Sequence, residues 1–316
     1  MFPGFTVADF EAFAPKKWKS NAFNRERLEV KQKLLALGRE LQSIMLSADG
    51  SPLAVEPSVE HPALWNHKQV EAQHLFFSRN EGARKELDAI IDRQKSLASM
   101  IDDPTPLRNH VFLVASVGFD ALDLAVKLHP DARVDRQNLE RKCEDHFERE
   151  KLVRALHHLG APFRAGVTPG LAPVGELDDA RLGEIIAALA APQGLVPPGA
   201  PAKLLYIGRA VARDEAIAAG AAIVETARAA MQSLIEIYRF IAWSRDNDFV
   251  SMREALQKEK QARRQKGLAK NDAVRIVRGM FAGKSGVVQE IDAKGGLKVL
   301  VGKVAVKIDV EDVAKN

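Results

Sequence analysis

The last fifty residues carry the pattern that most narrows the possible folds of this chain. After Lys270, apolar residues recur at every second position in short runs, which is the period of strands with one buried face. The alternating residues are Val274 and Ile276; Val288 and Ile291; Leu297, Val299 and Val301; Val304, Val306 and Ile308; and Val310 and Val313. Gly295-Gly296 and Gly302-Lys303 separate neighbouring runs and are typical of hairpin turns. Because an isolated hairpin of this size is marginal, we expect five strands over residues 269–316 that close into a small barrel.

The glycines of the stretch RGMFAGKSG, Arg278 to Gly286, look at first like those of a phosphate-binding loop. Such a loop needs four residues between its two glycines, but Gly279 and Gly283 enclose only three. A phosphate-binding loop also lies between a strand and a helix of a parallel sheet. Only thirty residues follow Gly286, which is too few for such a domain. We therefore expect no nucleotide here, and we interpret the three glycines as shaping a tight loop between the first two strands.

This C-terminal pattern resembles a known module. The segment NDAVRIVRGMFAGKSGVVQEID is similar to the KOW motif of NusG-type transcription elongation factors and of certain large-subunit ribosomal proteins, and LKVLVGKVAVKIDVEDV resembles the remaining strands. The resemblance covers about Lys270 to Asn316. It implies an SH3-like barrel that contacts RNA or protein and has no catalytic residues. The loop positions that it implies for the binding tip are Arg278, Met280, Phe281 and Lys284.

Residues 249–268 are predicted to form a basic linker helix before the barrel. In SMREALQKEKQARRQKG, Ser251 and Glu254 have the spacing of a capping box, and Gly267 supplies a stop. Residues 253–316 contain 15 Lys and Arg against 8 Asp and Glu, or +7; the other residues contain 31 against 34, or −3, which gives the net charge of +4. This asymmetry favours a polyanionic partner for the C-terminal end.

We therefore expect a non-catalytic protein whose C-terminal module contacts RNA or a ribonucleoprotein complex, either the ribosome or the RNA polymerase machinery. The candidate binding residues are Arg263, Arg264, Lys266, Arg275, Arg278, Phe281 and Lys284. Phosphate contacts by the cations would be salt-dependent, and an exposed Phe281 would stack on bases. Three alternatives stay open: the basic helix is a solvated tether, Phe281 fills the barrel, and the partner is a protein.

Residues 1–248 are predicted to form an α+β domain of unknown function. By residue number, the expected strands are 70–78, 110–117, 122–129 and 203–208, and the expected helices are about 5–13, 24–45, 87–101, 135–160 and 214–243. The stretches FTVADFEAF and GRAVARDEAIAAG…IYRFIAW are similar to an uncharacterised bacterial family typified by YktB, and this resemblance implies no site. The domain is about twice as long as a NusG-type N-terminal domain, so polymerase binding is not carried over to it.

An unrecognised enzyme in this domain is the alternative function. All eight histidines lie between His61 and His158, and Cys143, His146 and Glu150 are spaced to share a helix face, as metal ligands can. No established metal, nucleophile or dinucleotide motif accompanies them, so we expect no metal and no cofactor. His74 is more simply a hydrogen-bonded core histidine. The stretch WSRDNDF, residues 243–249, either lines a polar site or ends one helix and caps the next; we favour the caps.

The chain is expected to be cytoplasmic. It has no run of about eighteen apolar residues, its N-terminus lacks the pattern of a secretory signal, and a lone cysteine forms no internal disulfide. A membrane partner is therefore not expected.

Overall fold

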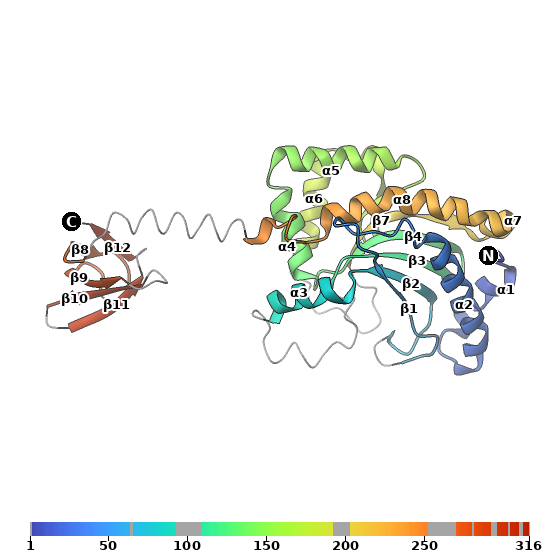
Figure 1. Cartoon of the computed structure of the whole chain (residues 1–316), viewed down its shortest axis with the longest axis horizontal. Helices are drawn as coiled ribbons and strands as arrows, with labels where there is room; N and C mark the ends of the chain where they lie inside the picture. The colour runs from blue at the N-terminus through green and yellow to red at the C-terminus, as the bar shows by residue number, and fades with distance from the viewer. Residues whose placement is uncertain are drawn as a thin grey trace. The chain divides into compact units, whose positions relative to one another are not determined.

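The chain is an α+β protein whose described residues fall into two compact units, unit 1 at Met1–Phe249 and unit 2 at Val250–Asn316 (Figure 1). A computed structural model describes residues 2–63, 66–92, 109–191, 203–251, 270–279, 281–291, 296–302, 304–309 and 312–315. The chain is helical at residues 249–251, and the rest of the predicted linker helix lies outside the described residues. In the ranges given, no helix is long and apolar enough to span a bilayer.

Unit 1 is built on a seven-stranded antiparallel sheet with the strand order β1-β2-β3-β4-β7-β5-β6. The strands are β1 (Ala54–Pro57), β2 (Ala72–Ser78), β3 (Phe112–Gly118), β4 (Ala121–Leu128), β5 (Arg164–Val167), β6 (Gly170–Pro173) and β7 (Leu205–Ala212). Strand β7 returns late in the chain and pairs with both β4 and β5. It therefore joins the sheet formed by β1 to β4 to the β5–β6 hairpin.

One face of this sheet is covered by helices, as Figure 1 shows. The helices are α1 (Val7–Glu11), α2 (Asn24–Leu41), α3 (Glu81–Asp92), α4 (Arg133–Lys142), α5 (His146–Leu159), α6 (Asp179–Ala190), α7 (Arg213–Ala219) and α8 (Ile223–Ile241). Along β3, Leu113, Ala115 and Val117 belong to the core beneath the helices, whereas Val114 belongs to a separate cluster on the other face. Strands buried on both faces explain why these runs are almost continuously apolar.

Two predicted helices are broken in the structure. The helix expected over 135–160 is α4 followed by α5, because the Asp145 carboxylate accepts from the backbone N–H groups of Phe147 and Glu148, at 2.9 and 3.1 Å, and starts a new helix. Phe147, one of the apolar residues in the pattern that predicts a helix over 135–160, is 72% exposed. The helix expected over 214–243 is interrupted at Gly220, whose φ of +53° lies outside the helical range.

Several other expectations are confirmed, and four elements were not predicted. Strands β2 and β7, the β3–β4 hairpin and the first two helices lie where the sequence places them. The alternation in residues 70–78 predicts that the side of Ala72, His74 and Phe76 is the buried one. In the structure the helices cover the other side of β2, that of Leu75 and Phe77, and both sides carry large apolar residues. The unpredicted elements are β1, β5, β6 and α6.

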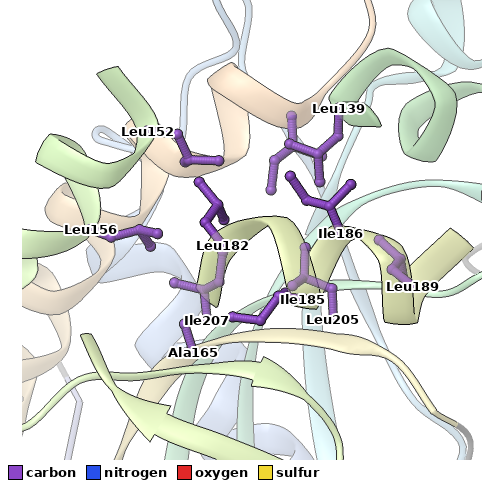
Figure 2. A pocket seen from close by; sticks show the side chains of 11 residues that line it. Leu139, Leu152, Leu156, Ala165, Leu182, Ile185, Ile186, Leu189, Leu205 and Ile207 are labelled. Atoms are coloured by element: carbon purple, nitrogen blue, oxygen red, sulfur yellow. The ribbon is translucent and has the colours of Figure 1, made fainter. Parts of the chain in front are cut away.

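A small gap in the core lies beneath α6, where Figure 2 shows the side chains around it. Its volume is about 10 Å³, close to the minimum for one water molecule. Every residue around it is apolar, including Leu152, Leu182 and Ile207. A water needs two to four polar partners. The gap is therefore a packing defect rather than a ligand site.

Unit 2 is a five-stranded antiparallel sheet with the order β11-β10-β9-β8-β12. Its strands are β8 (Ala273–Ile276), β9 (Ser285–Ile291), β10 (Gly296–Val301), β11 (Val304–Asp309) and β12 (Val313–Lys315). The five expected strands are confirmed, and alternate residues form the core: Val274, Val288, Leu297 and Val299.

The expectation of a closed barrel is wrong for this sheet. Strands β11 and β12 are its two edges, and in the described part of unit 2 no ladder joins them. Strand β12 is only three residues long, and all three pair with β8. Such a short strand offers few backbone groups with which to close the sheet against β11.

Candidate nucleic-acid interface

The loop between β8 and β9 is a tightly closed hairpin. The backbone N–H of Gly283 donates to the carbonyl of Ile276 at 2.7 Å, and the N–H of Ile276 donates to the carbonyl of Lys284 at 2.9 Å. Gly279 and Gly283 have φ values of +84° and +87°, a region that side chains disfavour. These two glycines shape the loop, as the sequence predicts, and the loop backbone is thereby fixed.

Gly286 has a different role from the one predicted. It lies within β9 and not in the loop, and a Cβ atom there would lie 2.6 Å from Val299 Cγ1 and 2.7 Å from the Leu300 carbonyl oxygen. Glycine is needed at this position for the close approach of β10.

Three of the predicted cations lie on this hairpin. Arg275 is on β8, on the side opposite the buried Val274 and Ile276, and is exposed. Arg278 and Lys284 are exposed at the two ends of the loop. Among the residues that the structure describes, none of these three cations forms an ion pair with a carboxylate. No described carboxylate therefore offsets their charge, which can act on an anionic partner.

Phe281 lies in the same loop, three residues before Lys284, whose backbone N–H donates to its carbonyl at 3.1 Å. Its side chain is partly exposed. The partly buried residues that pack against the described core of unit 2 are Ile291, Val301, Ile308 and Val313. Phe281 is not one of these, which argues against the alternative that it fills the interior of the module and leaves its ring available for stacking.

The remaining predicted residues cannot be placed. Arg263, Arg264 and Lys266 of the linker helix, and Met280 of the loop, lie outside the described residues. The hairpin therefore brings together Arg275, Arg278, Phe281 and Lys284 from the predicted set.

Two further lysines were missed by the sequence reasoning. Lys298 and Lys307 are directly opposite each other on β10 and β11, and both are exposed. With Glu290, Gly296 and Ala305 they line a hollow of about 320 Å³. Like charges opposite each other are unfavourable unless an anion or a neighbouring carboxylate offsets them. The alternation in the sequence could have identified them, because each lysine stands between two inward-facing apolar residues and is therefore expected to point outward.

Exposed apolar side chains also occur on unit 2. Val277 and Val287 are exposed, and Val304 is 60% exposed. Exposed apolar side chains are typical of protein-binding surfaces, so a protein partner, the alternative given in the sequence analysis, still applies to unit 2.

The three residues considered as metal ligands in unit 1 do not all lie on one helix. Cys143 ends α4 and is buried, whereas His146 begins α5 after the Asp145 cap. Burial raises the pKa of the Cys143 thiol to about 12, which keeps it protonated and a poor ligand. Across the described ranges of the chain, no three His, Cys, Asp or Glu residues are grouped as a metal site would require.

His74 is hydrogen-bonded, as the sequence predicts. Its Nδ1 atom lies 2.7 Å from the Ser116 hydroxyl, on the sheet face opposite the helices. Burial, with a smaller contribution from nearby Lys127, lowers the pKa of His74 to about 4. The imidazole is therefore neutral at pH 7.

The stretch 243–249 has both of the roles considered for it. The Asn247 side chain donates to the carbonyls of Arg239, Phe240 and Ala242, at 3.2, 3.1 and 2.8 Å, and so satisfies the end of α8. In addition, residues 243–246 line a cavity of about 200 Å³. The preferred interpretation is thus confirmed for the end of α8, and these residues also border a polar cavity.

The chain matches no protein-family model and none of the curated proteins.

Proposed function

We propose that unit 2 is a KOW-type module that binds single-stranded RNA, alone or within a ribonucleoprotein complex of the cytoplasmic transcription or translation machinery. The observation that carries the proposal is the β8–β9 hairpin, on which Arg275, Arg278 and Lys284 are exposed without a carboxylate partner among the described residues. Phosphate contacts by such cations give tight, sequence-tolerant binding.

The other residues of the surface fit the same partner. A partly exposed Phe281 beside the cations can stack on an unpaired base, which every base permits because each has a π-face. Lys298 and Lys307 extend positive charge to the outward face of β10 and β11. A duplex would leave the Phe281 ring with no accessible base, so single strands are the favoured form.

The test is equilibrium binding of the full chain to a fluorescein-labelled single-stranded RNA at several salt concentrations. Each phosphate contact contributes about −0.7 to the slope of log K against log salt. We expect the double variant Arg278→Ala/Lys284→Ala to bind more weakly and to reduce the magnitude of the slope by about 1.4. Phe281→Ala should weaken binding while leaving the slope unchanged.

The matched control removes two exposed cations from unit 1, Arg25→Ala/Lys85→Ala, and lowers the net charge equally. It should leave both affinity and slope nearly unchanged. Equal effects of the two double variants would show that net charge, not the hairpin, attracts RNA. Absence of salt-dependent binding by the unaltered protein would refute the proposal.

A protein partner is the second candidate, favoured by the exposed valines at positions 277, 287 and 304. Affinity capture from lysate with and without ribonuclease separates the two. Capture that survives ribonuclease, together with failure to bind RNA directly, would support the adaptor function in place of RNA binding.

A further inference from the structure

A polar cavity in unit 1 lies where three distant segments of the chain meet. Its walls are the turn at residues 47–51, the end of β2 with the first turns of α3, and the last turn of α8 with residues 243–246. The volume is about 200 Å³, roughly the liquid volume of six or seven water molecules. Its size suits a small metabolite rather than a macromolecule.

Hydrogen bonds between the segments fix the walls. Asn80 Nδ2 donates to the Ser51 hydroxyl at 3.1 Å, which joins the start of α3 to the turn. Arg239 donates to the Leu46 carbonyl through Nε at 3.1 Å and Nη2 at 2.9 Å, which joins α8 to the same turn. The cavity is therefore formed by side chains that are already held in place, as a binding site requires.

The arginines around the cavity are all neutralised by carboxylates. Each forms an ion pair, so the cavity has no excess positive charge with which to hold an anion. The pairs are Arg79 with Asp135, Arg239 with Glu236 and Arg245 with Glu86.

Two carboxylates that line the cavity, Asp49 and Asp246, are exposed and form no ion pair with a cation in the described residues. Asp49 accepts hydrogen bonds from the Ser51 backbone, at 2.9 Å, and from the Ser47 hydroxyl. These bonds, the one from Ser47 foremost, lower the pKa of Asp49 to about 2 and keep it charged. Asp246 has no cationic partner among the described residues. Within that part of the chain the cavity thus carries two uncompensated negative charges.

The remaining lining suits an apolar body with a polar end. The partly exposed Ala83 and Ala242 supply apolar surface, whereas the aromatic residues Tyr238 and Trp243 in the lining are almost fully buried. Tyr238 is 1% exposed, and its hydroxyl has no hydrogen-bond partner in the described structure. A buried hydroxyl without a partner is destabilising, and an occupant of the cavity can offset that cost.

From the charge, size and lining together, we infer that this cavity binds a small organic cation, a primary amine with a short apolar body. The carboxylates of Asp49 and Asp246 attract the ammonium group, and the alanine side chains pack against the carbon chain. This site lies wholly in unit 1 and is independent of the proposed RNA binding by unit 2.

The experiment uses ligand-observed NMR on the full chain with four probes of similar size: butylamine, 1,4-diaminobutane, butanol and butyrate. The amines should bind, with 1,4-diaminobutane the tighter at low salt because it carries two positive charges against two carboxylates. Butanol and butyrate should bind at least tenfold more weakly. Equal binding of butyrate and butylamine, or no binding of either amine at 10 times the protein concentration and above, to about 10 mM, would overturn the inference.

Two variants locate the binding. Asp246→Asn removes an exposed charge and should weaken amine binding about fivefold, and Ala83→Leu fills the cavity and should abolish binding of both amines. Asp214→Asn removes an equivalent exposed carboxylate from α7, outside the cavity, and should change nothing. Circular dichroism checks that each variant is folded. Amine binding that survives Ala83→Leu in a folded protein would refute this location.

Discussion

The buried Asp135 carboxylate offers a sharp test of how unit 1 is held together. Asp135 is 0% exposed, and each of its oxygens accepts two hydrogen bonds. Oδ1 accepts from Arg79 Nη2 and, at 2.8 Å, from the Trp243 backbone N–H. Oδ2 accepts from Arg79 Nη1 and from the Val111 backbone N–H, both at 2.8 Å. We predict that Asp135→Asn is strongly destabilising, although it changes the shape of the side chain very little.

The magnitude follows from the geometry. Whichever way the new amide is oriented, its NH₂ group faces two donors, so two hydrogen bonds are lost and Arg79 keeps a buried charge without a counterion. Removing one partner of a buried ion pair costs about 3 to 5 kcal/mol. For an unfolding slope of about 3 kcal/mol per molar urea, the midpoint should fall by about 1 to 2 M.

Tryptophan fluorescence during urea unfolding measures this effect in unit 1 alone, because all three tryptophans precede residue 250. The double variant Arg79→Gln/Asp135→Asn removes both charges, so its destabilisation should be smaller than the sum of the single effects by about 1 kcal/mol or more. Asp214→Asn, an exposed control, should stay within about 0.5 kcal/mol of the unaltered protein. Additive single effects, or a cost below about 1 kcal/mol for Asp135→Asn, would refute this account.

Two further predictions concern the sheets. Gly286→Ala places a methyl group 2.6 Å from Val299 Cγ1 and 2.7 Å from the Leu300 carbonyl oxygen, so unit 2 should lose about 1 to 3 kcal/mol; hydrogen exchange of the β9 and β10 amides measures this, and unchanged protection would contradict it. The pKa of His74, lowered to about 4 in the folded state, predicts that stability present above pH 6.5 is lost as the pH falls from 6.5 to 4, by up to about 3 kcal/mol. The unfolded state binds the proton over this range and the folded state does not, so unfolding of His74→Gln, followed at several pH values, should show a weaker dependence in that window.

Local patterns predicted much of the fold correctly. At the start of the helix expected over 5–13, Thr6 and Asp9 have the spacing of a capping box. The structure contains this box, with the Thr6 backbone N–H donating to the Asp9 carboxylate at 2.6 Å. The alternation after residue 270 indicated five strands. These signals depend on neighbouring residues alone, which is why they can be recognised without knowledge of the tertiary structure.

The predictions of the fold that were wrong concern features that depend on contacts between distant residues. Whether the C-terminal sheet closes depends on pairing between β11 and β12, which alternation does not encode. The helix break at Asp145 required choosing a cap over a continuing apolar pattern, and Phe147 supported the wrong choice. Strands β5 and β6 are only four residues long and contain glycine and proline, so their sequences show no alternation from which a strand could be predicted.

The candidate sites show the same division. Arg275, Arg278, Phe281 and Lys284 were identified because a single hairpin contains them all. For the polar cavity of unit 1, the sequence indicated only residues 243–249 as a possible polar site. The other walls come from residues 47–51 and from the start of α3. A site assembled from three remote segments leaves no compact motif in the sequence.

The late return of β7 has a consequence for how unit 1 is made. Because β4 ends at Leu128 and β7 begins only at Leu205, a growing chain carries β4 and β5 with unpaired edges throughout the synthesis of the intervening residues. Exposed strand edges invite pairing with other chains. The edges of β4 and β5 therefore stay unpaired until β7, which ends at residue 212, has been synthesised. A chain that ends before β7 has two partial sheets without the strand that joins them.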